Sequence, residues 1–245
     1  VFLDGDAIKH GKAIAYDYLV IAIGSTTNFY NIPGAEKKAC KLATVEDALA
    51  IKDKLVSLFA GAKPEQVRVV VIGGGPTGCE LSAELAQYAD ELARKFGKDI
   101  IITLIERNSL LPQESDAFRK LLTKRFKLSR LNILLNAQVT FVKKGAVEFL
   151  PTTEGKAEKK KIAVDMVVWT AGIKPADLET VPKLEKPNGF FAVDERLRVK
   201  SGGRIYSNVY ACGDCALITN PDGTFVPQSA QAAAEEGKFA ASNVL

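Results

Sequence analysis

The sequence predicts an α/β protein with two nested domains, each a parallel sheet with helices plus a β-meander. Three observations support this class. The β-branched run Val69–Ile72 ends in a glycine-rich turn, and a helical pattern and a second apolar run follow it. Segments 16–24 and 164–172 share the order Asp, short apolar strand and Gly. Short strands bounded by turns lie between 133 and 164. Strands that alternate with helices are typical of parallel sheets.

The turn Gly73-x-Gly75-x-x-Gly78 carries the strongest functional signal. Gly73 permits a tight turn, Gly75 lets a pyrophosphate approach the backbone, and Gly78 lets the next helix pack close to the strand. The N–H groups at that helix start favour a phosphate. The segment therefore predicts dinucleotide binding in a Rossmann-like domain. A glycine-rich turn of some other α/β fold is disfavoured, because strand, helix, strand and acid follow in order.

The residues after the turn indicate which dinucleotide binds. A helix is expected from Thr77 to about Phe96, and the strand 99–106 ends in Glu106. A carboxylate at this place accepts a hydrogen bond from the ribose 2′-hydroxyl of NADH and repels the 2′-phosphate of NADPH. Arg107 could instead accommodate that phosphate. The sequence thus favours NADH and leaves NADPH possible.

Two further helices are interpreted as packing elements. One spans 44–59 with Thr44 as its N-cap, and the other spans 115–126. The residues expected to face inward are Val45, Leu49, Leu55, Leu58 and Phe59 in the first helix, and Phe118, Leu121, Leu122 and Phe126 in the second.

The β-meander is expected to consist of strands 133–142, 146–150 and 162 onward, and the fragment before Tyr16 is interpreted as the tail of a similar one. Near the C-terminal end, strand 204–214 leads into a glycine turn with Asp214, whose carboxylate could accept from sugar or ribityl hydroxyls. An alanine-rich helix is expected over 227–243. The expected domains are 1–35 and 176–245 for the outer one, 36–65 for a connecting helix and 66–175 for the inserted one.

Composition excludes some classes. The net charge of +4 is too small to argue for nucleic acid, and no apolar stretch reaches the roughly 18 residues of a membrane span. Cys212 and Cys215 have CxxC spacing, which suits a redox pair, half a zinc site or two cysteines that flank a turn. The interpretation as two cysteines that flank a turn is favoured, and no metal site is expected. The chain begins with Val1 and has a single Met, Met166, so a truncated chain is expected.

Taken together, the motifs resemble the FAD-dependent pyridine nucleotide-disulphide oxidoreductases, which have two nested dinucleotide domains. The matching segments are 16–25, 67–80, 164–175, 209–216 and 227–237. Within this superfamily, Trp169–Gly172 with Pro175, and the helix with Ala230 and Gln231, look most like type II NADH dehydrogenases and the related ferroptosis-suppressor-type NAD(P)H:quinone oxidoreductases.

The resemblance implies roles for particular residues. Glu80 and Gln231 would lie near the reacting rings. The residues expected at NAD(P)H are Gly73, Gly75, Pro76, Thr77, Gly78, Glu106, Arg107, Ala171 and Gly172. Those expected at FAD are Ile23, Gly24, Ser25, Gly213, Asp214, Gln231 and Ala232.

The implied activity is hydride transfer from NADH to FAD, then two-electron delivery to a small acceptor, most simply a quinone. An intracellular enzyme is expected, with peripheral membrane association through a C-terminal segment not present here, and a homodimer is possible. Two features depart from the pattern: Glu235 stands where a second Gln is usual, and no second GxGxxG for FAD exists. A disulfide reductase of the same superfamily and a non-catalytic NAD(H)-binding redox sensor remain alternatives.

Overall fold

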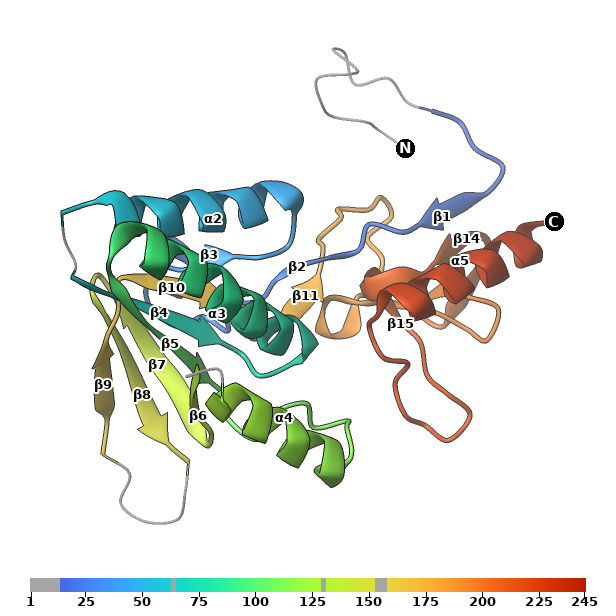
Figure 1. Cartoon of the computed structure of the whole chain (residues 1–245). Coiled ribbons are helices and arrows are strands. Elements are labelled where there is room, and N and C mark those ends of the chain that lie inside the picture. Colours follow the sequence, from blue (N-terminus) through green and yellow to red (C-terminus); the bar gives the residue numbers. More distant parts are fainter. Residues whose placement is uncertain (1–13, 63–64, 129–130, 153–157) are drawn as a thin grey trace. The chain divides into compact units, whose positions relative to one another are not determined.

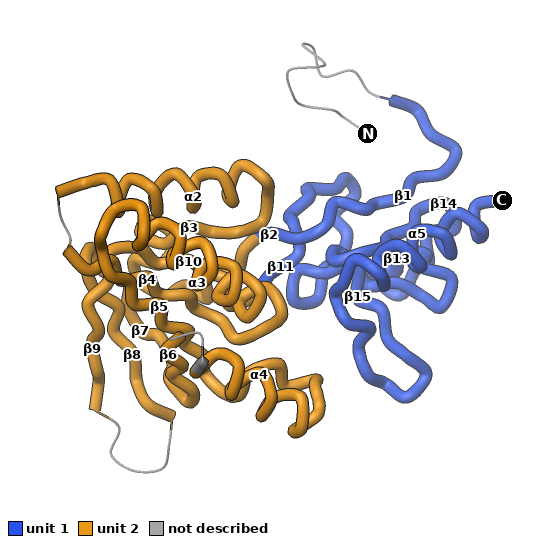
Figure 2. The backbone as a smooth tube through the Cα atoms, viewed as in Figure 1, with its two compact units in different colours: residues 1–26, 173–245 blue, residues 27–172 orange. Residues whose placement is uncertain are grey.

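The computed structural model describes residues 14–62, 65–128, 131–152 and 158–245 (Figure 1). They form two compact units, and Figure 2 colours them separately. Unit 2 is the continuous segment Thr27–Gly172, and unit 1 joins the described residues before Thr27 to Ile173–Leu245. The α/β class is confirmed, and one unit is inserted into the other. The units divide near 27 and 172, whereas the expected domain ends were 35 and 175.

The central sheet of unit 2 has five parallel strands in the order β3-β10-β4-β5-β6. Their bounds are Cys40–Lys41 for β3, Met166–Trp169 for β10, Gln66–Ile72 for β4, Asp99–Ile105 for β5 and Leu131–Leu134 for β6. The chain adds β5 and β6 on one side of β4 and then places β10 on the other side. Ligands of open α/β sheets bind at such a reversal, beyond the carboxyl ends of the strands.

The two faces of this sheet pack against different layers. Successive strand residues point to opposite faces, so Val69 and Val71 enter the core with the helices α2, Val45–Ala60, and α3, Pro76–Phe96. Val70 and Ile72 enter a second core with the antiparallel sheet of β7, Ala137–Lys143, β8, Ala146–Pro151, and β9, Lys160–Ala163. The run Val69–Ile72 is continuously apolar because both of its faces are buried.

Two expectations about unit 2 are wrong. The run 133–142 is not one strand: β6 ends at Leu134 in the parallel sheet, Asn136 turns with φ 52°, and β7 starts the antiparallel sheet. The helix α2 is not a connector between domains, because Ile51, Leu55 and Phe59 are buried in the core of unit 2.

The inward faces of two helices also differ from expectation. On α2, Val45 and Leu49 are 71% and 51% exposed, because the buried face follows Ile51 at intervals of four residues. On α4, Asp116–Leu128, the side chains of Phe118 and Leu121 are 45% and 56% exposed, while Phe126 is buried. A short helix, α1, spans Ala35–Lys38.

Unit 1 contains a three-stranded sheet in the order β1-β14-β13, with bounds Leu19–Ile21, Arg204–Ala211 and Arg198–Ser201. The strand β1 is parallel to β14, and β13 is antiparallel to it. The helix α5 spans Ala230–Val244 and starts three residues later than expected, because Ser229 is its N-cap. The expected meander tail before Tyr16 lies outside the described residues, except for 14 and 15.

Smaller elements complete unit 1, and one of them, β2, Ser25–Thr27, ends at the first residue of unit 2. The strand β2 pairs with β11, Ile173–Pro175, and β12, Phe191–Ala192, pairs with β15, Ala216–Leu217. Two short 3₁₀ turns span Pro187–Gly189 and Gly213–Cys215. The second of them carries Asp214.

Candidate dinucleotide site

The glycine-rich turn leads from β4 into α3 with the geometry that its spacing predicts. Gly73 has φ +113°, and a Cβ there would lie 2.6 Å from Cα of Ala171. A Cβ on Gly78 would overlap the carbonyl oxygen of Gly73 and approach Oγ1 of Thr170 to 2.6 Å. These two glycines therefore allow the close packing of the turn on β10. A Cβ on Gly75 would meet no atom within 4 Å, so the space beside its backbone is open.

The start of α3 offers unpaired backbone donors. The N-cap is Gly75, which has no side chain to accept from the first N–H groups of the helix. Pro76 follows it, and the first turn contains no acidic residue. The first N–H groups of a helix have no partner within the helix, and the helix dipole adds positive charge there. With open space at Gly75, this helix start suits the pyrophosphate of a dinucleotide.

The carboxylate of Glu106 lies directly beside the turn. Its Oε2 accepts from N–H of Gly74 at 2.6 Å, and its Oε1 accepts from N–H of Asn108 at 2.9 Å. The side chain is half-buried. Two backbone donors thus orient the acid, and each carboxylate oxygen keeps a lone pair for a further donor such as a ribose hydroxyl.

A cavity of about 340 Å³ lies at the carboxyl ends of β4, β5 and β10. Four residues expected at NAD(P)H line it: Gly73, Glu106, Arg107 and Ala171. The other lining residues are Tyr30, Ile32, Ile72, Ile105, Asn108, Ala137, Gln138, Val139 and Trp169. The structure therefore joins the expected acid and turn to walls drawn from distant parts of unit 2.

Two of the wall residues are aromatic, and sequence reasoning assigned them no role at NADH. Trp169 is almost fully buried, its Nε1 donates to the carbonyl of Asn28 at 2.8 Å, and its ring packs on Phe29 at 5.6 Å. Tyr30 lies beside Gly172, where an added Cβ would approach the ring at 3.0 Å. Gly172 thus makes room for Tyr30 and does not itself line the cavity. Tyr30 lies six residues after Gly24 and outside every predicted strand and helix, so no pattern in the sequence pointed to it.

The remaining residues expected at NAD(P)H lie at the helix start. Gly75, Pro76 and Thr77 form the first turn of α3, and Gly78 is buried under it. Glu80 is exposed on α3 and does not line the cavity.

The residues expected at FAD lie in unit 1. Oγ of Ser25 donates to Oδ2 of Asp214 at 2.8 Å, and both side chains are half-buried. N–H of Gly213 donates to Oε2 of Glu236 at 2.6 Å. Ile23 and Gln231 are exposed, Gly24 accepts from Ala176 through its carbonyl, and Ala232 lies near Gly213 at the start of α5.

The fit of unit 1 to FAD is partial. The cavity beside Asp214 has a volume of only about 10 Å³. The sequence has one GxGxxG, and it lies in unit 2. The described residues of unit 1 therefore offer a hydroxyl–carboxylate pair for part of a flavin nucleotide, but no phosphate-binding turn. In unit 2, by contrast, turn, helix start and acid fit a dinucleotide.

The CxxC pair does not have the character of a redox-active thiol pair. Cys212 and Cys215 are free and buried. Burial raises the pKa of both thiols. Sγ of Cys215 contacts the carbonyl of Cys212 at 3.3 Å. Buried, protonated thiols are poor nucleophiles. The structure therefore favours the interpretation that the two cysteines flank the Asp214 turn and do not form a redox pair.

Comparisons with known proteins place the chain in one family. The family model of the pyridine nucleotide-disulphide oxidoreductases matches residues 1–237. The type II NADH:quinone oxidoreductase of Haemophilus influenzae is 29% identical over 99% of this chain and 58% of its own length. The external NADH-ubiquinone oxidoreductase 2 of Saccharomyces cerevisiae mitochondria is 31% identical over 94% of this chain and 44% of its own length.

A solved structure of NDH2 from Plasmodium falciparum in complex with NADH superposes with a TM-score of 0.75 at 30% identity, over 84% of this chain and 45% of that one. The chain thus spans about half the length of the relatives that it matches. With the family model covering nearly the whole sequence and the glycine turn, Glu106 and the nested units in place, the chain belongs to the pyridine nucleotide-disulphide oxidoreductase family.

Proposed function

We propose that this chain carries the NADH-binding unit, and part of the flavin-binding unit, of an FAD-dependent NADH:quinone oxidoreductase. The observation that carries the proposal is the oriented Glu106 carboxylate beside an open glycine turn and an uncapped helix start. The names of the two relatives and the NADH complex of the solved structure support the cofactor and the acceptor.

In this proposal, each part of the site in unit 2 binds one part of NADH. The backbone at Gly75 and the first turn of α3 bind the pyrophosphate. Glu106 accepts from the ribose 2′-hydroxyl, and its negative charge disfavours the 2′-phosphate of NADPH. The apolar walls at Ile72, Ile105 and Val139 exclude water from the bound nucleoside.

In unit 1, Asp214 would accept a hydrogen bond from a hydroxyl of FAD, and Ser25 orients that carboxylate. When bound, FAD supplies the two-electron chemistry that links nicotinamide to a quinone. Glu80 and Gln231, which both have exposed side chains, are proposed to lie near the reacting rings. The proposed acceptor is a quinone, and a membrane-bound quinone implies association with a membrane surface.

The binding half of the proposal is tested with Gly75→Val. No atom lies within 4 Å of the new Cβ, so the fold should be unchanged while the pyrophosphate loses its approach. Losing about 3 kcal/mol of charge-assisted hydrogen bonds corresponds to about 100-fold weaker NADH binding. Trp169, the only Trp in the sequence, lines the cavity and reports binding through its fluorescence.

Gly237→Val is the matched control, because Gly237 also has no atom within 4 Å of an added Cβ but lies on α5 in unit 1. It should leave the NADH titration unchanged. Equal affinity of both variants and the parent would contradict the site. The catalytic half is tested on a flavin-loaded protein that contains this chain, by NADH oxidation with either a short-chain quinone or a small disulfide as acceptor. Turnover with the disulfide alone would contradict the quinone reductase.

A further inference from the structure

The helix α4 concentrates positive charge. Within Asp116–Leu128 there are five basic residues and one acidic residue, so this one helix carries as much net charge as the whole chain. Arg119 is bonded to Asp116 and to the carbonyl of Glu114. Lys120, Lys124 and Lys127 are exposed, and within the described part of the chain none of them forms an ion pair.

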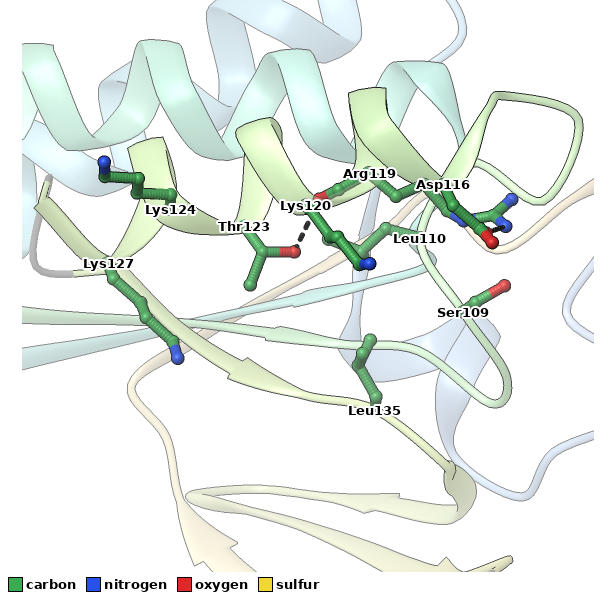
Figure 3. Close-up of a pocket in the computed structure, with 9 residues that line it drawn as sticks. All are labelled: Ser109, Leu110, Asp116, Arg119, Lys120, Thr123, Lys124, Lys127 and Leu135. Carbon is green, nitrogen blue, oxygen red and sulfur yellow. Dashed lines mark hydrogen bonds and ion pairs between the residues drawn. The ribbon is translucent and has the colours of Figure 1, made fainter.

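A groove of about 470 Å³ runs along this helix. Figure 3 shows Lys120, Thr123 and Lys127 extending from α4 toward the side on which Leu135 lies. Leu135 contributes exposed apolar surface, whereas Leu110 borders the groove but is buried in the core of unit 2. The hydroxyl of Thr123 is bonded to the carbonyl of Arg119. The groove therefore has four basic side chains around one exposed leucine, and its single acidic residue, Asp116, is bonded to Arg119.

A neighbouring side of α4 exposes large apolar side chains. Phe118 and Leu121 are 45% and 56% exposed and lie three residues apart, so they share one side of the helix. Lys120, Lys124 and Lys127 are spaced by four and three residues and share the neighbouring side. A basic amphipathic helix that exposes Phe and Leu is typical of a segment that lies on a membrane surface.

We propose that α4 docks on a membrane rich in anionic phospholipid. The lysine side chains would meet phosphate groups at the groove, and Phe118 and Leu121 would enter the headgroup region. A soluble anion would match the lysines but leave Phe118 and Leu121 in water. The proposal adds a membrane contact to the proposed quinone reductase but does not depend on it, because vesicle binding can be measured without NADH or FAD.

The test is co-sedimentation of the 245-residue chain with vesicles of phosphatidylcholine alone and of phosphatidylcholine with 30% phosphatidylglycerol, about one lipid in three. Binding is expected only to the anionic vesicles. It should weaken between 0.1 M and 1 M salt, since the screening length falls from about 10 Å to about 3 Å.

Two charge-reversal variants identify the surface. Each basic side chain near an anionic leaflet strengthens binding by about fivefold, so Lys120→Glu, Lys124→Glu and Lys127→Glu together should weaken vesicle binding by at least about 100-fold. The control changes Lys159, Lys160 and Lys161, which are exposed at β9, to Glu. Both triple variants have the same net charge, but only the first should lose binding.

The double variant Phe118→Ser and Leu121→Ser tests the apolar contribution and should weaken binding while keeping its salt dependence. Circular dichroism of every variant should match the parent. Equal losses in the two lysine triples, or no binding of the parent to anionic vesicles, would overturn the proposal. Binding of the parent to polyglutamate but not to vesicles would also overturn it and would assign α4 to an acidic protein partner.

Discussion

At the scale of single residues, two backbone amides hold the Glu106 carboxylate beside the glycine turn. The sequence predicted an acid at the end of the second strand, but not that the acid also closes the turn by accepting from Gly74. Glu106 therefore has two roles: it orients the loop after β5 and presents negative charge to a nucleotide.

Replacing Glu106 should change nucleotide preference. Glu106→Gln keeps an acceptor for Gly74 but removes the charge. We expect NADH to bind about tenfold more weakly, because a charge-assisted bond is lost, and NADPH to bind no more weakly than to the parent. Titrations of Trp169 fluorescence with both nucleotides measure this, and equal losses for NADH and NADPH would contradict the role of Glu106.

The cysteines should differ in reactivity. Burial, with the carboxylates of Glu106 and Glu80, raises the pKa of Cys79 to about 11. Since a raised pKa keeps the thiol protonated, only about 0.1% of Cys79 is thiolate at pH 8. Iodoacetamide at pH 8 should label Cys40, which is half-buried, and leave Cys79, Cys212 and Cys215 unlabelled until unfolding. Peptide mass spectrometry gives the result, and rapid labelling of the CxxC pair in the folded protein would favour a disulfide reductase.

At the scale of elements, a local signal placed the start of α2 correctly. Thr44 caps α2 as expected, and a capping box with Asp47 completes the cap: Oγ1 of Thr44 accepts from N–H of Asp47, and Oδ2 of Asp47 accepts from N–H of Thr44. The same signal could not assign the buried face. Val45 fits an apolar pattern yet is exposed, because the face of α2 that packs on the core is the one that carries Ile51, Leu55 and Phe59.

The cap of α2 should contribute measurable stability. Thr44→Ala removes the acceptor for N–H of Asp47 and should lower the free energy of unfolding by about 1 kcal/mol. Thr44→Ser, which keeps the hydroxyl, should change it by less than half as much. Urea denaturation followed by circular dichroism compares the variants. Equal midpoints for the parent and Thr44→Ala would contradict the contribution of the cap.

At the scale of the whole molecule, the inserted unit is continuous in sequence and the outer unit is not. The buried residues of both cores of unit 2 lie between Ala35 and Trp169, and their partly buried neighbours lie between Phe29 and Ala171. The core of unit 1 joins Ile21 to residues far along the chain, such as Phe191 and Tyr210. Unit 2 therefore has the buried surface that an independent domain needs.

The excised segment 27–172 should fold and bind NADH. Because the turn, Glu106 and Trp169 all belong to it, we expect its affinity for NADH to equal that of the whole chain within about threefold. Circular dichroism and titration of Trp169 fluorescence measure folding and binding. An unfolded segment, or a folded one that does not bind NADH, would show that unit 1 is required.

The sequence by itself determined the parallel sheet, the glycine turn and the acid after β5. These features depend on local properties: β-branched residues favour a buried strand, glycines admit the turn and the close packing at Gly78, and the strand carries Glu106 to its end. Only the tertiary structure decided that the run 133–142 divides between two sheets, and that Val45 and Leu49 stay exposed. It alone brought Tyr30 and Trp169 to the cavity at Glu106, since contacts between residues more than 60 positions apart leave no periodic trace in the sequence.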